Sequence, residues 1–165
     1  MNNKEIELRK EITQKIKQIF FLRKKSIKFI PGKTWIQYAG GVFDDKEINA
    51  SVSVLIDGWF GLGKKAEEME KQLTDFLGVK GSILTNSGSS ANFLSIASLM
   101  SSLFPNRLNI GDEVITSACG FPTTINPIIT HGLVPVFLDV NPETYNINVY
   151  DLEKAISSKT RLVML

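Results

Sequence analysis

Twice in this chain a short apolar run passes through a turn of small residues directly into a helical pattern. The first run is residues 82–84, followed by Thr-Asn-Ser-Gly-Ser-Ser-Ala-Asn at residues 85–92 and by a pattern that predicts a helix over residues 89–104. The second is residues 111–117, followed by Ala-Cys-Gly-Phe-Pro-Thr-Thr at residues 118–124. Strand–helix alternation of this kind predicts an α/β fold, with a mainly parallel sheet and helices on both faces.

Further elements fit the same alternation. The pattern predicts a helix from Lys64 to Leu77 that ends at Gly78, and another that begins at Asn148. Strands are expected over residues 133–138 and 160–165. Pro135, inside the first of these, predicts a bulge or an amide without a ladder partner.

The first turn has the composition of an anion site. The first amides of a helix have no internal partner and carry partial positive charge, so they favour a phosphate. Gly88 lets the backbone approach a ligand closely, and Ser87, Ser89 and Ser90 add small hydroxyl groups. The alternative interpretation is that Ser87 or Ser89 only caps an ordinary helix.

The second turn presents an aromatic ring at what we expect to be the same sheet edge. Both turns follow parallel strands, and open α/β sheets bind ligands at the carboxyl ends of their strands. Phe121 lies between Gly120 and Pro122, which restrict its backbone. A phosphate cradle beside an aromatic plate suits a flat, phosphorylated heteroaromatic ring. The alternative is that Phe121 is a core residue.

These motifs have a known counterpart. With Gly-Asp-Glu-Val-Ile-Thr at residues 111–116, Gly-Phe-Pro-Thr-Thr-Ile-Asn-Pro-Ile-Ile at 120–129 and Gly-Leu-Val-Pro-Val-Phe at 132–137, the chain resembles the DegT/StrS-type sugar aminotransferase family. The resemblance runs from about residue 30 to the end. It implies the aspartate-aminotransferase-like large domain (PLP fold type I), incomplete at its C-terminus, and pyridoxal 5'-phosphate or pyridoxamine 5'-phosphate as cofactor.

Within that family the chain is most similar to one branch. Ser-Ser-Ala-Asn in the cradle, the unbroken Gly-Phe-Pro-Thr-Thr stretch, and Pro-Gly-Lys at residues 31–33 with Tyr-Ala-Gly at 38–40 resemble the CDP-4-keto-6-deoxy-D-glucose 3-dehydrases of lipopolysaccharide synthesis. The expected function is therefore C3 dehydration of a nucleotide-linked keto-deoxyhexose. A nucleotide-sugar aminotransferase of the same family and a truncated, inactive chain are the alternatives.

The resemblance also assigns roles to residues. Gly88, Ser89 and Ser90 would hold the cofactor phosphate, and Phe121 would stack on its ring. No catalytic residue is expected in this chain, because the family's cofactor-binding lysine (a histidine in the dehydratase branch) and the aspartate at the pyridine nitrogen lie downstream. The cysteines of a [2Fe-2S] cluster would also lie there. The implied partners are a nucleotide-sugar substrate, a second copy in a homodimer and a reductase.

Length and domain organisation follow from the same comparison. The chain has 165 residues, whereas enzymes of this family are about twice as long or more, and residues 160–165 resemble a core strand in progress. We expect an N-terminal part of a longer protein. It would comprise a basic amphipathic helix at 1–28, a connecting segment at 29–63 and the start of the cofactor-binding domain at 64–165. In the connecting segment, residues 57–63 lack the family's hydroxyl-rich stretch and carry extra glycines, which predicts a flexible loop.

Charge is concentrated at the N-terminus. Residues 1–28 hold nine Lys or Arg against three Glu, a net charge of +6, while the whole chain is +2. Such helices can bind anionic lipid or nucleic acid, but docking by one apolar stripe is the favoured interpretation. Neither nucleic acid nor a membrane span is expected, since no apolar run is long enough to cross a bilayer.

Single residues complete the prediction. Cys119 is the one cysteine, which excludes an internal disulfide and fits a reducing cytoplasm. We expect it to be a small buried hydrophobic residue. His131, the one histidine, is expected at a helix C-terminus, away from the ligand turns. One histidine and one cysteine do not form a metal site.

Overall fold

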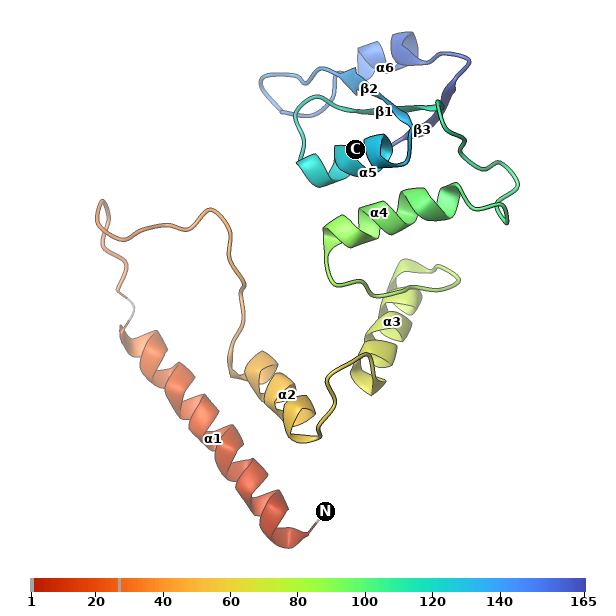
Figure 1. Ribbon diagram of the computed structural model, residues 1–165. Coiled ribbons are helices and arrows are strands. Elements are labelled where there is room, and N and C mark those ends of the chain that lie inside the picture. The colour runs from red at the N-terminus through yellow and green to blue at the C-terminus, as the bar shows by residue number, and fades with distance from the viewer. Residues whose placement is uncertain (1, 27) are drawn as a thin grey trace. The chain divides into compact units, whose positions relative to one another are not determined.

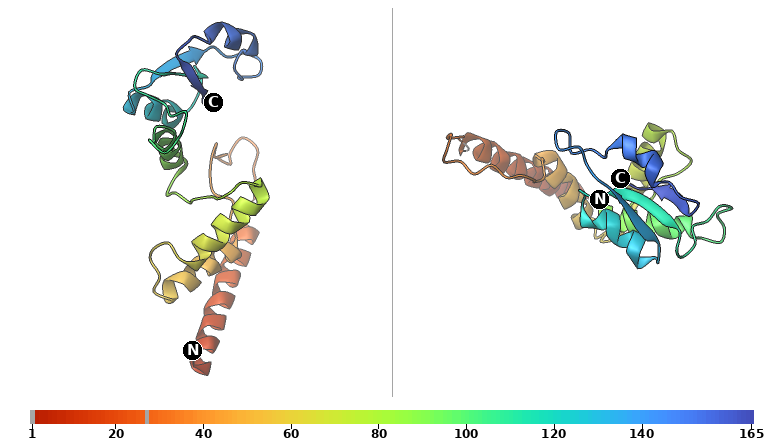
Figure 2. Two further views of the ribbon diagram at one scale, coloured as in Figure 1. Left: turned by 90° about the vertical axis from the view of Figure 1, so that its right-hand side faces the viewer. Right: turned by 90° about the horizontal axis from the view of Figure 1, so that it is seen from above.

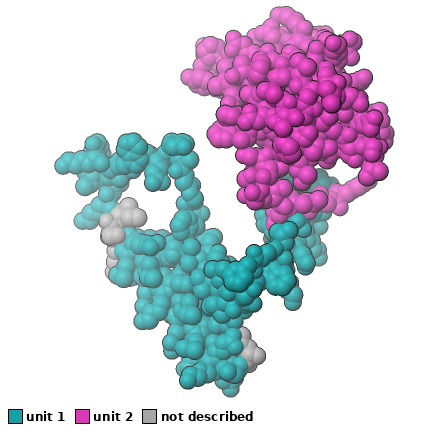
Figure 3. Space-filling model, in the orientation of Figure 1, with its two compact units in different colours: residues 1–79 teal, residues 80–165 magenta. Residues whose placement is uncertain are grey.

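The computed structural model describes residues 2–26 and 28–165 (Figure 1). The chain divides into two compact units, residues 1–79 and residues 80–165 (Figure 3). The boundary between the two units lies between residues 79 and 80. The predicted divisions at residues 28 and 63 stay predictions. Among the residues that the structure describes, no helix combines the length and the apolar character needed to cross a bilayer.

The first unit consists of the helices α1 (Asn3–Ser26), α2 (Asp45–Ile56) and α3 (Lys64–Leu77). The expected N-terminal helix is confirmed as α1, although residues 1 and 27 of that prediction lie outside the described residues. α3 has the predicted bounds and ends at Gly78, whose φ of +64° is the left-handed conformation that glycine adopts without strain.

The helix α2 was not predicted from the sequence. It begins with a capping box, in which Asp44 Oδ1 accepts a hydrogen bond from the amide of Lys46 (2.8 Å) and Glu47 Oε2 accepts one from the amide of Asp44 (2.7 Å). The backbone hydrogen bond from Lys46 holds the pKa of the Asp44 carboxyl below its ordinary value. An ion pair joins α1 to the end of α2, between Arg9 and Asp57 (2.8 Å).

The second unit is built on a parallel sheet with the strand order β2-β1-β3. Its strands are β1 (Glu113–Ser117), β2 (Val134–Leu138) and β3 (Thr160–Val163), which confirms the strands expected in these regions. Pro135 lies in regular register opposite Val114, so of the two expected alternatives, a bulge or an amide without a ladder partner, the bulge is not found. The irregular register lies instead between β1 and β3, at Glu113 and Val114.

Helices cover both faces of this sheet, as the sequence predicted. α4 (Gly88–Leu99) and α5 (Pro122–Thr130) lie on one side, and α6 (Val149–Ala155) lies on the other (Figures 1 and 2). The core between α4, α5 and the sheet contains five buried hydrophobic residues: Ile96, Leu108, Val114, Ile128 and Leu133. α6 begins at Asn148 as expected, and the side chain of Asn148 accepts a hydrogen bond from the amide of Tyr150.

Two expectations about the first turn are wrong in this unit. Residues 82–84 form no strand, and Ile83 is 78% exposed, because no neighbouring strand pairs with them among the described residues. The helix that follows ends at Leu99 rather than at residue 104. The amide of Leu108 donates to the carbonyl of Leu99 (2.9 Å), so the residues between them, Pro105 included, form a loop after the helix.

Candidate functional site

The first turn forms a capped helix N-terminus. The Ser87 hydroxyl accepts a hydrogen bond from the amide of Ser90 and donates one to the Ser90 hydroxyl, both at 3.1 Å. Ser87 is therefore the N-cap of α4. This cap uses the third amide of α4, so the amides of Gly88 and Ser89, which have no intrahelical acceptor, are the ones left for a ligand.

The surface at Gly88 is open. A Cβ atom built on Gly88 would meet nothing within 4 Å, so the fold itself does not require glycine at this position. Ser89 is exposed and Ser90 is half-buried. Open space, two available amides and two hydroxyl groups at the positive end of a helix are the features that an anionic group requires.

The second turn holds an exposed aromatic ring. The Ser117 hydroxyl accepts from the amide of Cys119 (3.2 Å) and donates to the Cys119 carbonyl (3.0 Å), which tightens the turn after β1. Phe121 then occupies the N-cap position of α5, and it is 72% exposed. Phe121 is therefore not a core residue of this unit. Its ring is accessible to a ligand at the carboxyl end of β1.

One hydrogen bond joins the two turns. Asn92, in the second turn of α4, donates from Nδ2 to the carbonyl of Thr123 in α5 (3.2 Å). The N-termini of both helices lie on the side of the sheet edge at which β1 ends (Figure 1). The structure thus brings the region of Gly88, Ser89 and Ser90 to the same side of the unit as Phe121.

Other sequence predictions are resolved here. His131 caps the C-terminus of α5, at the opposite end from the two turns, with its Nδ1 atom 2.8 Å from the carbonyl of Pro127. Cys119 is exposed rather than buried, because it belongs to the turn that Ser117 tightens and not to a strand. In the described part of the chain, no group of three or more His, Cys, Asp or Glu side chains is placed to hold a metal ion.

Within residues 57–63 the side chain of Trp59 closes a turn. The indole N–H of Trp59 donates to the carbonyl of Leu62 (2.8 Å). A Cβ atom on Gly63 would lie 2.3 Å from Trp59 Nε1, so the indole occupies the space that a side chain at this position would need. Gly63 therefore has a packing role in this turn.

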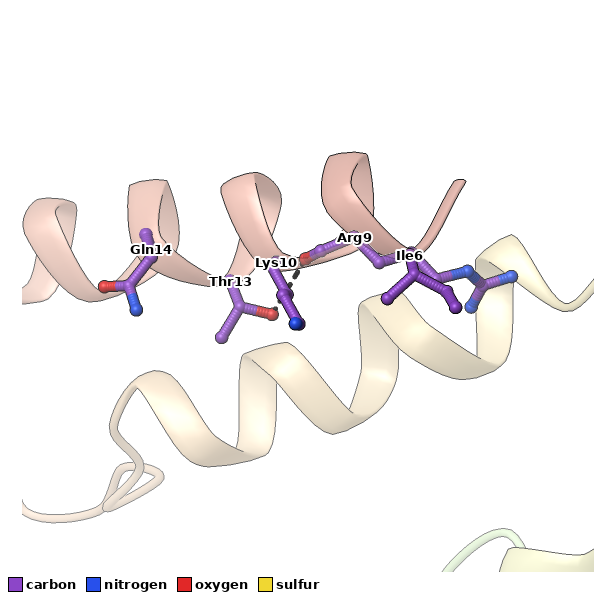
Figure 4. A pocket seen from close by; sticks show the side chains of 5 residues that line it. All are labelled: Ile6, Arg9, Lys10, Thr13 and Gln14. Atoms are coloured by element: carbon purple, nitrogen blue, oxygen red, sulfur yellow. Dashed lines mark hydrogen bonds between the residues drawn. The ribbon is translucent and has the colours of Figure 1, made fainter. Parts of the chain in front are cut away.

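A basic hollow of about 260 Å³ lies on α1 rather than at the two turns (Figure 4). It is lined by Ile6, Arg9, Lys10, Thr13 and Gln14. Arg9 is already engaged by two carboxylates, Glu5 (2.9 Å) and Asp57 (2.8 Å), and the hydrogen bonds to them raise the pKa of its guanidinium. Because its arginine is neutralised in this way, we do not assign the phosphate to this hollow.

Comparison with known proteins defines the class. The sequence model of the DegT/DnrJ/EryC1/StrS aminotransferase family matches residues 42–165, and the chain belongs to this family. It is 40% identical over 159 residues to the lipopolysaccharide biosynthesis protein RfbH of Salmonella typhimurium, a match that covers 96% of this chain and 36% of RfbH.

Two dehydratases extend the comparison. The chain is 44% identical over 138 residues to a dTDP-4-dehydro-2,6-dideoxy-D-glucose 3-dehydratase of Saccharopolyspora spinosa, covering 83% of this chain and 30% of the relative. Its fold is similar to that of an E. coli GDP-4-keto-6-deoxy-D-mannose-3-dehydratase with bound hydrated PLP, with a TM-score of 0.70 and 34% identity. That match covers 76% of this chain and 32% of the dehydratase. The chain therefore spans about a third of the length of these relatives and has the fold of the matching part of a PLP fold type I enzyme.

Proposed function

We propose that this chain supplies the phosphate cradle and the ring-stacking aromatic of a nucleotide-sugar enzyme that uses pyridoxal 5'-phosphate or pyridoxamine 5'-phosphate. The proposed reaction is C3 dehydration of a CDP-4-keto-6-deoxyhexose in lipopolysaccharide and deoxysugar synthesis. Two of the relatives are named as 3-dehydratases and a third as a lipopolysaccharide biosynthesis protein, which supports this choice. When bound, the cofactor supplies an amine or aldehyde and an electron-accepting ring, which the reaction at the sugar requires.

In this proposal the chain's own residues bind and orient. The amides of Gly88 and Ser89, with the hydroxyls of Ser89 and Ser90, hold the phosphate at the positive end of α4. Phe121 covers one face of the ring. The observation that carries the proposal is the open space at Gly88, on the same side of the unit as an aromatic ring that is 72% exposed.

Binding experiments test this assignment. In the full-length protein, titration with pyridoxal 5'-phosphate, followed by absorbance, should give much weaker binding for Ser89→Glu, because a carboxylate would stand where the phosphate belongs. Ser89→Ala should cost less, about 1–2 kcal/mol, because one hydroxyl hydrogen bond is lost while the amides remain. Ser95→Glu is the matched control, since Ser95 is an exposed residue of the same helix farther from its N-terminus.

The outcome is decisive in either direction. If Ser89→Glu binds the cofactor as the unsubstituted chain does, the first turn is an ordinary capped helix and the assignment of the site is wrong. If only Ser89→Glu loses binding and Ser95→Glu does not, the effect belongs to the position of the charge and not to its presence.

The nature of the reaction needs its own test. An aminotransferase of the same family is the alternative, supported by the name of the family itself, and an inactive chain is the second alternative. We expect residues 1–165 alone to turn over no nucleotide keto-sugar, because the cofactor-binding lysine or histidine of the family lies beyond them. Turnover by the purified chain with pyridoxamine 5'-phosphate would contradict this. The proposal further includes a cytoplasmic homodimer, a reductase partner and a [2Fe-2S] cluster outside residues 1–165.

A further inference from the structure

The helix α5 contains a proline that leaves one carbonyl without its usual partner. In a regular α-helix the carbonyl of residue 123 accepts from the amide of residue 127. Residue 127 is Pro127, which has no N–H, and it is buried inside α5. The half-buried carbonyl of Thr123 therefore lacks its helical donor and is open to a donor from elsewhere.

Asn92 provides that donor from the neighbouring helix. Its Nδ2 lies 3.2 Å from the Thr123 carbonyl, and the two residues are 31 positions apart in the sequence. The side-chain amide thus replaces the helical hydrogen bond that Pro127 removes. A helical hydrogen bond would join two residues of α5, whereas the hydrogen bond from Asn92 joins α5 to α4.

This bond lies between the two ligand turns. Thr123 is two residues after Phe121, and the amide of Thr124 donates to the Phe121 carbonyl (2.9 Å), so holding Thr123 also holds the start of α5. Asn92 is four residues after Gly88, which places it on the same face of α4, one helical turn beyond the cradle. The distance between the cradle and the aromatic ring therefore depends on the bond from Asn92.

The next residue of α4 holds the other end of α5. The ring of Phe93 packs on His131, with the ring centroids 4.4 Å apart. His131 in turn contacts the carbonyl of Pro127 through Nδ1 (2.8 Å). α5 is thus fixed against α4 at its C-terminus as well. Loss of the Asn92 bond should therefore free the N-terminal turn of α5, which carries Phe121, without detaching the helix.

We propose that Asn92 is a positioning residue of the cofactor site: by donating to the carbonyl that Pro127 leaves open, it sets the position of Phe121 relative to the phosphate cradle. This inference rests on the proposed function. It adds a residue that does not itself contact the cofactor but decides whether phosphate and ring are held at the same time.

The test compares stability with cofactor binding on the full chain. Asn92→Ala should raise the Kd for pyridoxal 5'-phosphate by about three- to tenfold, the loss expected for one hydrogen bond. It should also reduce the induced circular dichroism of the bound ring. In the cofactor-free chain, amide hydrogen exchange at residues 119–124 should become faster. Ser95→Ala, which removes a hydroxyl that bonds only within α4, is the matched control.

A second substitution separates positioning from support of the fold. Pro127→Ala restores an amide at residue 127, which can bond to the Thr123 carbonyl within α5. The chain with both Asn92→Ala and Pro127→Ala should therefore have nearly the same free energy of unfolding as the chain with Pro127→Ala alone. The Kd should nevertheless remain raised by about three- to tenfold, since the restored bond is internal to α5 and does not join it to α4.

Two results would overturn the inference. One is an Asn92→Ala chain that binds the cofactor as tightly as the unsubstituted chain and shows unchanged exchange at residues 119–124. The other is a Kd that recovers together with stability when Pro127→Ala is added. If the unsubstituted chain itself binds no pyridoxal 5'-phosphate, the proposed function fails and this role of Asn92 fails with it. If the unsubstituted chain and the Asn92→Ala chain bind pyridoxal 5'-phosphate equally well, the role of Asn92 is wrong but the proposed function is not contradicted.

Discussion

The substitution Gly88→Ala should raise stability and lower cofactor affinity at once. A Cβ atom at this position meets nothing within 4 Å, and Gly88 begins α4 without a positive φ. Replacing such a glycine by alanine restricts the unfolded chain and stabilises the folded one by about 0.4–1 kcal/mol. If a phosphate uses the same space, the added methyl group overfills it, at a cost of about 1–3 kcal/mol, or roughly five- to 150-fold in Kd.

Urea denaturation and cofactor titration measure the two effects separately. Gly81→Ala is the control, since a Cβ atom at Gly81 also meets nothing within 4 Å but the residue precedes the cradle. The control should leave the Kd for pyridoxal 5'-phosphate unchanged. A Gly88→Ala chain with higher stability and unaltered affinity would refute the reasoning, because the open space would then not belong to the ligand.

Three further predictions follow from single contacts. Phe121→Leu should weaken cofactor binding by about 0.5–1.5 kcal/mol while leaving stability unchanged, since the ring is 72% exposed; equal affinity in the titration would contradict stacking. Gly63→Ala should displace the indole of Trp59 and break its hydrogen bond, measured as changed tryptophan emission in a Trp35→Phe background, and unchanged emission would show that the turn adapts. The pKa of Asp44 is lowered in the folded chain from its ordinary value of 3.8, so the Asp44 carboxylate stabilises α2 at pH values above 3.8. This stabilisation is lost as the pH falls through the lowered pKa, and far-ultraviolet circular dichroism of Asp44→Asn should lack this transition.

The sequence predicted most of the second unit because its elements are bounded by local signals. β1 follows Gly111, whose φ is +89°, and α6 begins at Asn148, whose side chain accepts from the helix it caps. Such signals depend only on residues a few positions apart, so they can be recognised without knowledge of the tertiary structure. The strand expected at residues 82–84 is different, because a strand exists only when another strand pairs with it.

The helix α2 shows the converse error. Its capping box at Asp44 and Glu47 is visible in the sequence, but none of its residues is buried. The helix therefore has no buried apolar stripe from which it could be predicted. Charge and capping, rather than burial, were the usable signals in this segment.

The candidate site was predictable in its turns but not in the contact between them. Gly88, Ser89, Ser90 and Phe121 could be named from their turns, although their role in cofactor binding stays a prediction. The bond from Asn92 depends on the packing of α4 on α5. Its one sequence signal is the proline four residues after Thr123, which shows that a carbonyl lacks a partner but not which residue supplies the donor.

The most direct test of the central claim is to map where the cofactor binds on the isotope-labelled chain by amide NMR during titration with pyridoxamine 5'-phosphate. The competing location for a phosphate is the basic hollow on α1, which contains Arg9 and Lys10. If the first turn holds the phosphate, the largest shifts occur at the amides of Gly88, Ser89 and Ser90, with smaller shifts at residues 119–124. Largest shifts on α1, or saturation without shifts at residues 88–90, would contradict it.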